Sequence, residues 1–386
     1  MIGQIVIVGA GQGGFQAAAS LRQEGYDGRI ILIGEEPEAP YQRPPLSKAY
    51  MKTGDAGQLA LRPAAFYDTN AIELRKGTRV DAIDRRAQRI QIGDEDLAYD
   101  HLILATGTRN MRPPIAGLEN TRDLRTLADA AALRDALARA ERIGVIGGGF
   151  IGLEFAAVAR AAGHHVTVAE AGARLMGRAV SSQMSDRFAQ KHGEMGTDIR
   201  LASPVAAVTP DGMTLADGTQ ISADFVLLAA GVVPNVELAL DAGLDVDNGI
   251  VVGNTLLTSD PSISALGDCA CFPDPATGRL VRLESVQAAT DHARLIAKRL
   301  VTGDQSAYRA VPWFWSDQSD WKLQIAGLAE ATDAAETLPD GTVLRLKGDQ
   351  VTAVETVNNA RAHMRTRKAM GQGSILTKED FVSAQV

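Results

Sequence analysis

The sequence predicts an α/β fold that contains two copies of one parallel-sheet unit, followed by a smaller α+β segment. Two short, mostly apolar runs carry this prediction, because residues 5–8 and 142–146 each lead directly into a glycine-rich stretch. An apolar run of this kind is typical of a buried parallel strand, and the glycines indicate a tight turn into a helix. The repetition indicates two copies of one supersecondary unit.

The first glycine-rich loop has the G-x-G-x-x-G spacing. Its glycines are Gly9, Gly11, Gly13 and Gly14. The first allows a tight turn, the second lets a pyrophosphate approach the backbone, and the last lets the next helix, predicted over 12–24, pack on the strand. The following strand, residues 29–34, ends at Glu35, where an acid can hold ribose hydroxyls. We therefore expect a dinucleotide here, with its pyrophosphate at the helix N-terminus.

The second loop repeats this arrangement. Its spaced glycines are Gly147, Gly149 and Gly152, and the strand 165–169 ends at Glu170. Two nucleotide sites in one chain suit a flavoenzyme that passes a hydride from a nicotinamide to a flavin. The charge of Glu170 would repel a 2′-phosphate, which predicts NADH rather than NADPH, although Arg174 lies only four residues further on.

Periodicity and turn residues predict the remaining elements. Short antiparallel strands are expected within 80–92, and buried strands over 102–107 and 225–231, each of which ends in a small-residue turn. Helices are expected over 127–141 and 285–300, and Ser47 is expected to be part of the entry to another. Further short strands are expected at 250–252, 263–268, 323–328, 343–346 and 351–356.

The composition describes an ordinary globular chain. It has 386 residues, 45% of them hydrophobic and 22% charged, and a net charge of −8, which argues against nucleic acid as a partner. No apolar run approaches the ~18 residues of a membrane span. We see no secretory signal, and we expect a cytoplasmic protein that does not associate with membranes. Cys269 and Cys271 cannot form a metal site alone, so no metal is expected.

Several residues have both a structural and a functional interpretation. Arg43 and Lys48 follow the first nucleotide unit, and they are either charges on a surface loop or groups that face a flavin. Asp268 ends an apolar strand, and it either stabilises a turn or holds the ribityl hydroxyls of a flavin. The aromatic residues 313–315 are either core residues or a surface on which a flavin stacks.

With these motifs in view, the chain resembles the FAD-dependent, NADH-using ferredoxin reductases that serve cytochrome P-450 enzymes and Rieske-type oxygenases. The resemblance covers nearly the whole chain, and its motifs are GAGQGG, RPPLSKAY, LATGT, GGGFIGLE, GVVPN, SDPSISALGDCA, RLESVQAA and PWFWSDQ. It implies the fold of glutathione reductase. The implied domains are an FAD domain over 1–111 and 235–311, an NADH domain over 112–234, and a C-terminal domain over 312–386.

The resemblance also implies roles for individual residues. FAD would contact the first glycine loop, Glu35, Arg43, Lys48, Val80, Thr106, Arg125, Asp268, Val286 and Trp315. NADH would use the second glycine loop, with Glu154 near the nicotinamide and paired to Lys48. Electrons would then pass singly to a [2Fe-2S] ferredoxin, with rubredoxin as the less favoured acceptor. An acidic acceptor would need a basic patch, for which the candidates are Arg294, Lys298, Arg299, Arg309 and Lys322.

Two other functions stay open at this point. A disulfide or peroxide reductase of the same fold would need a cysteine beside the flavin, but residues 36–50 contain none. A flavoprotein that signals through an NADH-driven conformational change, as in relatives of the apoptosis-inducing factor, would share both nucleotide sites. Rapid reoxidation by a ferredoxin would distinguish the reductase from the signalling protein.

Overall fold

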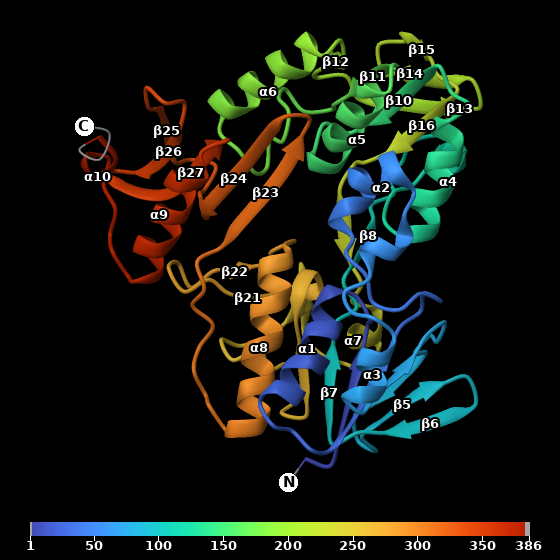
Figure 1. Cartoon of the computed structure of the whole chain (residues 1–386), viewed down its shortest axis with the longest axis vertical. Coiled ribbons are helices and arrows are strands. Elements are labelled where there is room, and N and C mark those ends of the chain that lie inside the picture. Colours follow the sequence, from blue (N-terminus) through green and yellow to red (C-terminus); the bar gives the residue numbers. More distant parts are fainter. Residues whose placement is uncertain (1, 383–386) are drawn as a thin grey trace. The chain divides into compact units, whose positions relative to one another are not determined.

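The structure is a computed structural model, and it describes residues 2–382 (Figure 1). The described chain divides into two compact units. The first unit contains residues 2–42, 57–109 and 233–310, and the second contains 43–56, 110–232 and 311–382. Each unit is described by itself below.

A five-stranded parallel sheet forms the centre of the first unit. Its order is β20-β7-β1-β2-β3, from Ile263–Ala265, His101–Leu104, Gln4–Val8, Arg29–Ile33 and Ile72–Arg75. The side chains of Ile5, Val6 and Ile7 are completely buried, as the apolar run predicted. Helix α1 (Gln12–Gln23) packs beside α8 (Val286–Thr302), as Figure 1 shows. The strands predicted for this sheet and the two predicted helices, α1 and α8, are therefore confirmed.

The second unit contains its own five-stranded parallel sheet, in the order β12-β11-β10-β16-β9. These strands are Asp198–Arg200, His165–Ala169, Arg142–Ile146, Phe225–Leu228 and Thr121–Arg122. Helices α5 (Phe150–Ala161) and α6 (Ser182–Glu194) belong to this part of the chain. The predicted helix over 127–141 is too long, because α4 spans Leu127–Leu137. After Leu137 the Arg139 N–H bonds to the Ala136 carbonyl, the tighter spacing that closes many helices.

The two units share a further feature, of which the sequence predicted the antiparallel strands within 80–92 in the first unit. Each parallel sheet has an accompanying three-stranded antiparallel sheet. In the first unit it is β4-β5-β6, from Ala82–Asp84, Arg89–Ile92 and Glu95–Ala98. In the second unit it is β13-β14-β15, from Val205–Thr209, Gly212–Leu215 and Gln220–Ser222. The internal repeat is therefore confirmed, although β6 was not predicted.

The C-terminal residues form an antiparallel sheet within the second unit, with the order β23-β24-β27-β26-β25. Its strands are Trp313–Gln318, Trp321–Gly327, Gln350–Val357, Val343–Lys347 and Ala334–Thr337. Helix α9 (Ala360–Gly371) packs on β24 and β27, and α10 spans Glu379–Val382. The aromatic run 313–315, which sequence reasoning did not assign to a strand, lies in β23.

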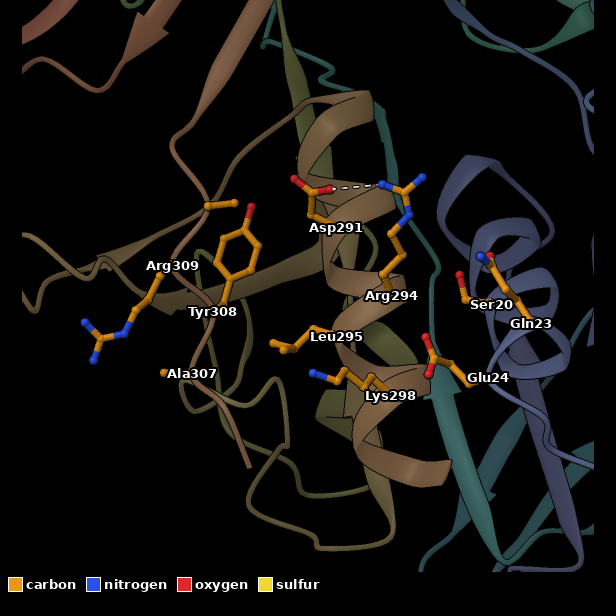
Figure 2. A pocket seen from close by; sticks show the side chains of 11 residues that line it. Ser20, Gln23, Glu24, Asp291, Arg294, Leu295, Lys298, Ala307, Tyr308 and Arg309 are labelled. Atoms are coloured by element: carbon orange, nitrogen blue, oxygen red, sulfur yellow. Dashed lines mark ion pairs between the residues drawn. The ribbon is translucent and has the colours of Figure 1, made fainter. Parts of the chain in front are cut away.

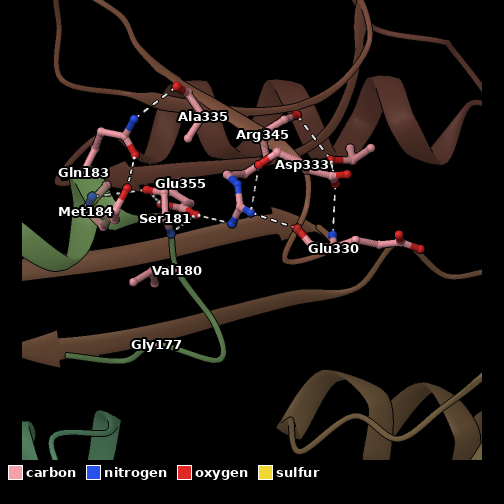
Figure 3. A network of polar contacts seen from close by, with 12 residues as sticks. Gly177, Val180, Ser181, Gln183, Met184, Glu330, Asp333, Ala335, Arg345 and Glu355 are labelled. Carbon is pink, nitrogen blue, oxygen red and sulfur yellow. Dashed lines mark hydrogen bonds and ion pairs between the residues drawn. The ribbon is translucent and has the colours of Figure 1, made fainter. Parts of the chain in front are cut away.

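The C-terminal sheet packs against α5 and α6 of the same unit. Phe188 of α6 and Leu323 of β24 belong to one buried apolar cluster. Beside it lies a buried polar network, shown in Figure 3, in which Glu355 of β27 accepts hydrogen bonds from the Ser181 N–H and hydroxyl at 2.7 and 2.6 Å. Because Ser181 is the N-cap of α6, a carboxylate of the C-terminal sheet holds the start of this helix. Arg345 lies 3.4 Å from the same carboxylate.

Short elements connect these layers. The short helices are α2 (Ala49–Thr53), α3 (Ala65–Thr69) and α7 (Glu237–Asp241). The remaining strands are β8 (Thr108–Asn110), β17 (Val232–Pro234), β18 (Val246–Asp247), β19 (Gly249–Val251), β21 (Ala270–Pro273) and β22 (Leu280–Val281). Pro44–Ser47 forms a 3-10 helix directly before Lys48, the N-cap of α2, so Ser47 lies at the entry to a helix, as predicted.

Candidate nucleotide sites and the Lys48–Glu154 pair

The glycines of the first loop differ in why the structure needs glycine at each position. Gly9 has φ +110°, and a Cβ there would lie 2.1 Å from the Ala105 carbonyl oxygen. A Cβ on Gly14 would lie 1.8 Å from the Gly9 oxygen, so α1 packs on the loop only with glycine at this position. A Cβ on Gly11, in contrast, would have no protein atom within 4 Å. The protein's own packing therefore does not require Gly11, whose open space fits a ligand group close to the backbone.

The second loop has the same asymmetry. Gly147 has φ +106°, with the Ala229 oxygen 2.4 Å from a hypothetical Cβ, and Gly152 is restricted by the Gly147 oxygen at 2.3 Å. Gly149, like Gly11, has open space around it. Both residues are N-caps, and neither of the helices they start has a side-chain cap. The N–H groups at the two helix N-termini are thus available to an anion.

The two predicted ribose acids occupy different environments. Glu35 is exposed and forms an ion pair with Arg79 at 3.0 Å. Glu170, directly after β11, accepts N–H bonds from Gly148 and Gly172, both at 2.6 Å. Glu170 therefore lies against the second glycine loop, at the place where the sequence predicted the acid.

Arg174 does not extend toward an added phosphate. Its guanidinium donates to the carbonyl oxygens of Val180 and Gly177, both at 2.6 Å. These bonds hold the loop that joins β11 to α6 in its own conformation. The Arg174 charge is thus bound to backbone carbonyl oxygens of its own loop. This was the charge that left the choice between NADH and NADPH open.

Two chain segments of the first unit meet at Thr106 and Asn235. The Thr106 hydroxyl donates to the Asn235 carbonyl oxygen at 2.7 Å, and the Asn235 amide donates to the Thr106 carbonyl oxygen at 2.8 Å. This reciprocal pair fixes the turn after β7, where a small residue was predicted to admit a cofactor. Asn235 was predicted only as part of the GVVPN motif.

The other residues predicted for FAD in this unit lie at ends of elements or in the core. Asp268 is in the 3-10 helix Gly267–Cys269, and its carboxylate accepts a bond of 3.4 Å from the Thr108 hydroxyl. Val286 is the first residue of α8, and Val80 is buried in the core of the unit.

An ion pair between a half-buried lysine and a buried carboxylate joins two motifs of the second unit. The Lys48 ammonium, at the start of α2, lies 3.0 Å from Glu154 Oε1 of α5. The Ser47 hydroxyl donates to Glu154 Oε2 at 2.5 Å, and the Ser316 hydroxyl donates to Oε1 at 2.8 Å. Glu154 is only 3% exposed. The predicted pairing of Lys48 with Glu154 is confirmed, whereas the two serines that complete the carboxylate's surroundings were not predicted.

Arg43, Arg125 and Trp315 lie in the same unit. The Arg43 guanidinium donates to the Arg125 carbonyl oxygen at 2.6 Å. Trp315 stacks on Trp313, with the ring centroids 5.4 Å apart and the planes at 30°. Trp313 also makes a cation–π contact with the Arg367 guanidinium, which lies 4.1 Å from the centroid of its ring. Trp315 is thus held by an aromatic neighbour within its own strand.

The predicted basic patch on α8 is wrong. Arg299 is 5% exposed, and it donates to Ser264 at 2.6 Å and to the Thr255 carbonyl oxygen. Burial lowers the pKa of Arg299 to about 10. Lys298 pairs with Asp304 at 2.6 Å.

The outer surface of α8 carries charges of both signs. A groove of about 350 Å³ lies along it, and Figure 2 shows its lining. Arg294, Lys298 and Arg309 share this lining with Glu24 and Asp291. The fifth candidate, Lys322, belongs to β24 in the other unit. Arg299 is buried and the other three candidates of this unit share the groove with acids, so these four residues do not form one basic surface.

The chemistry of the two cysteines is simple. Cys269 and Cys271 are both free and buried, and burial raises the pKa of each thiol. Within residues 2–382 there is no cluster of histidine, cysteine and acidic side chains that could hold a metal ion. In the same range, no helix is long and apolar enough to cross a membrane.

Two dinucleotide-binding folds in one chain, each with an open glycine position at a helix N-terminus, define a two-nucleotide redox enzyme. Comparison with known proteins gives the family. The sequence model of the pyridine nucleotide-disulphide oxidoreductases matches residues 3–293, and that of the reductase C-terminal domain matches 313–386. The chain belongs to the pyridine nucleotide-disulphide oxidoreductase family.

Individual relatives resemble the chain over most of its length. Rhodocoxin reductase of Rhodococcus erythropolis is 48% identical over 97% of this chain and 91% of its own. The ferredoxin reductase for the CYP199A2 system of Rhodopseudomonas palustris has a TM-score of 0.94 and 41% identity, over 98% of this chain and 96% of its own. Putidaredoxin reductase, in its covalent complex with putidaredoxin, has a TM-score of 0.91 and 40% identity, over 95% and 92% of the two chains.

The family and the two loops agree on the cofactors. Gly11 and Gly149 each leave space beside the N–H groups of a helix N-terminus, which suits the pyrophosphate of one dinucleotide per unit. The chain is an NAD(H)-dependent flavin oxidoreductase that uses FAD.

Proposed function

We propose that the chain takes a hydride from NADH onto FAD and then delivers single electrons to a [2Fe-2S] ferredoxin that feeds a cytochrome P-450 or a Rieske-type oxygenase. The Lys48–Glu154 pair is the observation that carries this proposal. It joins RPPLSKAY to GGGFIGLE, the two motifs that the resemblance assigns to the flavin and the nicotinamide. The names of the relatives support a ferredoxin as acceptor, because one of them is a ferredoxin reductase and another is bound to putidaredoxin.

Each part of the chain has a proposed task. Segments 1–111 and 235–311 bind FAD, residues 112–234 bind NADH, and 312–386 complete the protein as a C-terminal domain. Glu35 holds the adenosine ribose of FAD, and Val80 lies on the adenine side. Glu170 holds the ribose of NADH, and Arg43, Thr106, Arg125, Asp268, Val286 and Trp315 line the FAD site.

Bound FAD supplies the chemistry that converts a two-electron donor into a one-electron donor. The chain's own residues position the two cofactors and provide charge that stabilises the reduced flavin. The Lys48 ammonium would provide a fixed positive charge for the bound flavin, where Coulomb attraction favours added negative charge in a site of low dielectric constant. Glu154 holds that ammonium in place and would lie near the nicotinamide. Hydride transfer then depends on how closely the two rings are brought together.

A disulfide reductase activity has little support. Such an enzyme needs an accessible thiol with a low pKa. Cys269 is completely buried and Cys271 is 2% exposed, and burial raises both thiol pKa values. The ferredoxin proposal requires neither cysteine.

The proposal is tested by electron delivery to a panel of acceptors under anaerobic conditions. The purified protein with FAD is mixed with NADH and with a [2Fe-2S] ferredoxin, a rubredoxin or a small disulfide, and reduction of each acceptor is followed by its absorbance. We expect the ferredoxin to be reduced with the highest kcat/KM. Preference for rubredoxin would change the named partner. Rapid reduction of the disulfide alone, or flavin reduction by NADH with no acceptor reduced, would contradict the proposal.

A further inference from the structure

A chain of buried hydrogen bonds leads from Glu154 through the C-terminal sheet to α6. The Ser316 hydroxyl donates to Glu154 Oε1 at 2.8 Å, and Gln318 Nε2 lies 3.1 Å from Ser316 Oγ. Gln318 Oε1 in turn lies 2.9 Å from His192 Nε2. Ser316, Gln318 and His192 are each 0% exposed. We refer to these three residues as the donor chain.

The ion pair fixes the direction of every bond in the donor chain. Glu154 faces the Lys48 ammonium, so its ionised carboxylate only accepts hydrogen bonds. Ser316 has one hydroxyl proton, and it uses that proton in the hydrogen bond to Glu154. Its oxygen therefore accepts a hydrogen bond from the Gln318 amide nitrogen. The Gln318 oxygen then faces His192, and it can only accept. His192 must therefore carry its proton on Nε2.

Two further contacts agree with this direction. The second N–H of the Gln318 amide has the Met176 sulfur at 3.6 Å as a weak acceptor, which favours the same amide orientation. His192 Nδ1 is buried and has no hydrogen-bond partner among the described residues. An unpaired Nδ1 without a proton costs less than a buried cation, and burial lowers the pKa of His192. The ring at the end of the donor chain is thus neutral.

We propose that Ser316, Gln318 and His192 are positioning residues, whose one-way hydrogen bonds hold the Glu154 carboxylate, and through it the Lys48 ammonium, in place. This inference rests on the proposed function only for the role of Lys48. A buried carboxylate is costly unless donors surround it, and hydrogen bonds to a charged group are the strong ones. Through Ser316 and Gln318, strand β23 of the C-terminal domain contributes to the catalytic pair without touching substrate.

The first test measures the proton position on His192 directly. The protein with FAD is labelled with nitrogen-15 in its histidines, and the ring nitrogens are observed by NMR at pH 7, with His192→Phe for assignment. We expect a neutral ring protonated on Nε2. A proton on Nδ1, or on both nitrogens, would overturn the proposal. This readout does not depend on any electron acceptor, so it stays informative if no ferredoxin is reduced.

The second test separates positioning from packing. In Ser316→Ala we expect the limiting rate of flavin reduction by NADH to fall about tenfold, the effect of one hydrogen bond to a charge, with the Kd for NADH unchanged. Ser316→Thr keeps the hydroxyl and should restore the rate. Ser185→Ala removes a buried serine of α6 that donates to the Leu175 carbonyl outside the donor chain, and it should leave the rate unchanged. The bound FAD spectrum shows that each variant is folded.

The outcomes decide the matter. An unchanged rate in Ser316→Ala, or an equal loss in Ser316→Ala and Ser316→Thr, would reject the positioning role. If Ser316→Ala fails to retain FAD, Gln318→Met replaces it, because that variant removes the donor to Ser316 while keeping the side-chain volume. We expect it to slow flavin reduction about threefold, and an unchanged rate would equally reject the role.

Discussion

The Lys48 ammonium lies 3.0 Å from the Glu154 carboxylate, although 106 residues separate the two in the chain. The carboxylate is almost completely buried, and it also accepts from Ser47 and Ser316. Burying a carboxylate is costly unless partners surround it, and charged groups of this kind cluster at functional sites. The pair therefore forms the centre of the proposed mechanism.

Removal of the Lys48 charge should slow the chemistry without emptying the flavin site. In Lys48→Ala we expect the limiting rate of flavin reduction by NADH to fall about 10- to 100-fold, because one preorganised charge is lost, while FAD stays bound. Stopped-flow absorbance under anaerobic conditions measures the rate. Lys52→Ala, an exposed lysine on the same short helix, is the matched control. A wild-type rate in Lys48→Ala would remove this residue from the mechanism.

The two open glycines should separate the two nucleotides. Gly11→Ala places a methyl group in the space proposed for the FAD pyrophosphate, so the purified protein should be colourless yet folded. Gly149→Ala should retain FAD and raise the KM for NADH at least about tenfold. Gly14→Ala is the contrasting variant, because its Cβ would clash with the Gly9 oxygen and lower stability. If Gly11→Ala bound FAD normally, the open space would not be the pyrophosphate site.

The chain should strongly prefer NADH. Glu170 lies against the second glycine loop, and a 2′-phosphate near it would meet an uncompensated negative charge. We expect the kcat/KM for NADH to exceed that for NADPH at least about 100-fold, and Glu170→Ala to narrow the ratio by relieving the repulsion. Glu194→Ala, an exposed acid at the end of α6, is the control. Equal efficiency with both nucleotides in the wild-type protein would refute this interpretation.

Two buried histidines should make the fold sensitive to acid. Burial lowers the pKa of His101 and of His292 to about 3, whereas the unfolded chain takes up these protons near 6.5. As the pH falls from about 6.5 toward 3, the unfolded state alone binds protons, so the free energy of unfolding falls by about 1.4 kcal/mol per pH unit for each histidine.

Denaturant unfolding of the FAD-bound protein at several pH values between 7 and 5 measures this slope. His292→Phe should reduce the slope by the contribution of one histidine, about 1.4 kcal/mol per pH unit. The variant also loses the acceptor for the Gly267 N–H, so it should be less stable at every pH. A flat stability between pH 6.5 and 5 would mean that these rings accept protons in the folded state.

The sequence predicted the elements that depend on the pattern of neighbouring residues. Both glycine loops, the strands before them and the repeat of the small antiparallel sheet follow from spacing and periodicity over a few residues. The Lys48–Glu154 pair was also predicted, but only through the resemblance of two motifs. Ser47 and Ser316 were not predicted as partners of Glu154, because tertiary packing alone brings these distant segments together.

The error on α8 has a physical reason that the sequence contains. The near-helical spacing of Arg294, Lys298 and Arg299 on one helix predicts a single charged face. Arg299 follows Ile296 by three residues, however, and therefore continues the buried face of the helix. Charge type suggested the surface, whereas helical position correctly places this arginine inside, where Ser264 and a backbone carbonyl bind it.

The central claim is that NADH reduces FAD bound to this chain. An anaerobic titration of the purified protein with NADH, followed in the visible spectrum, tests it most directly. We expect a yellow protein whose flavin absorbance bleaches at about one NADH per FAD, as two-electron transfer to one flavin requires. A colourless protein, or a yellow one that NADH does not bleach, would contradict this reaction.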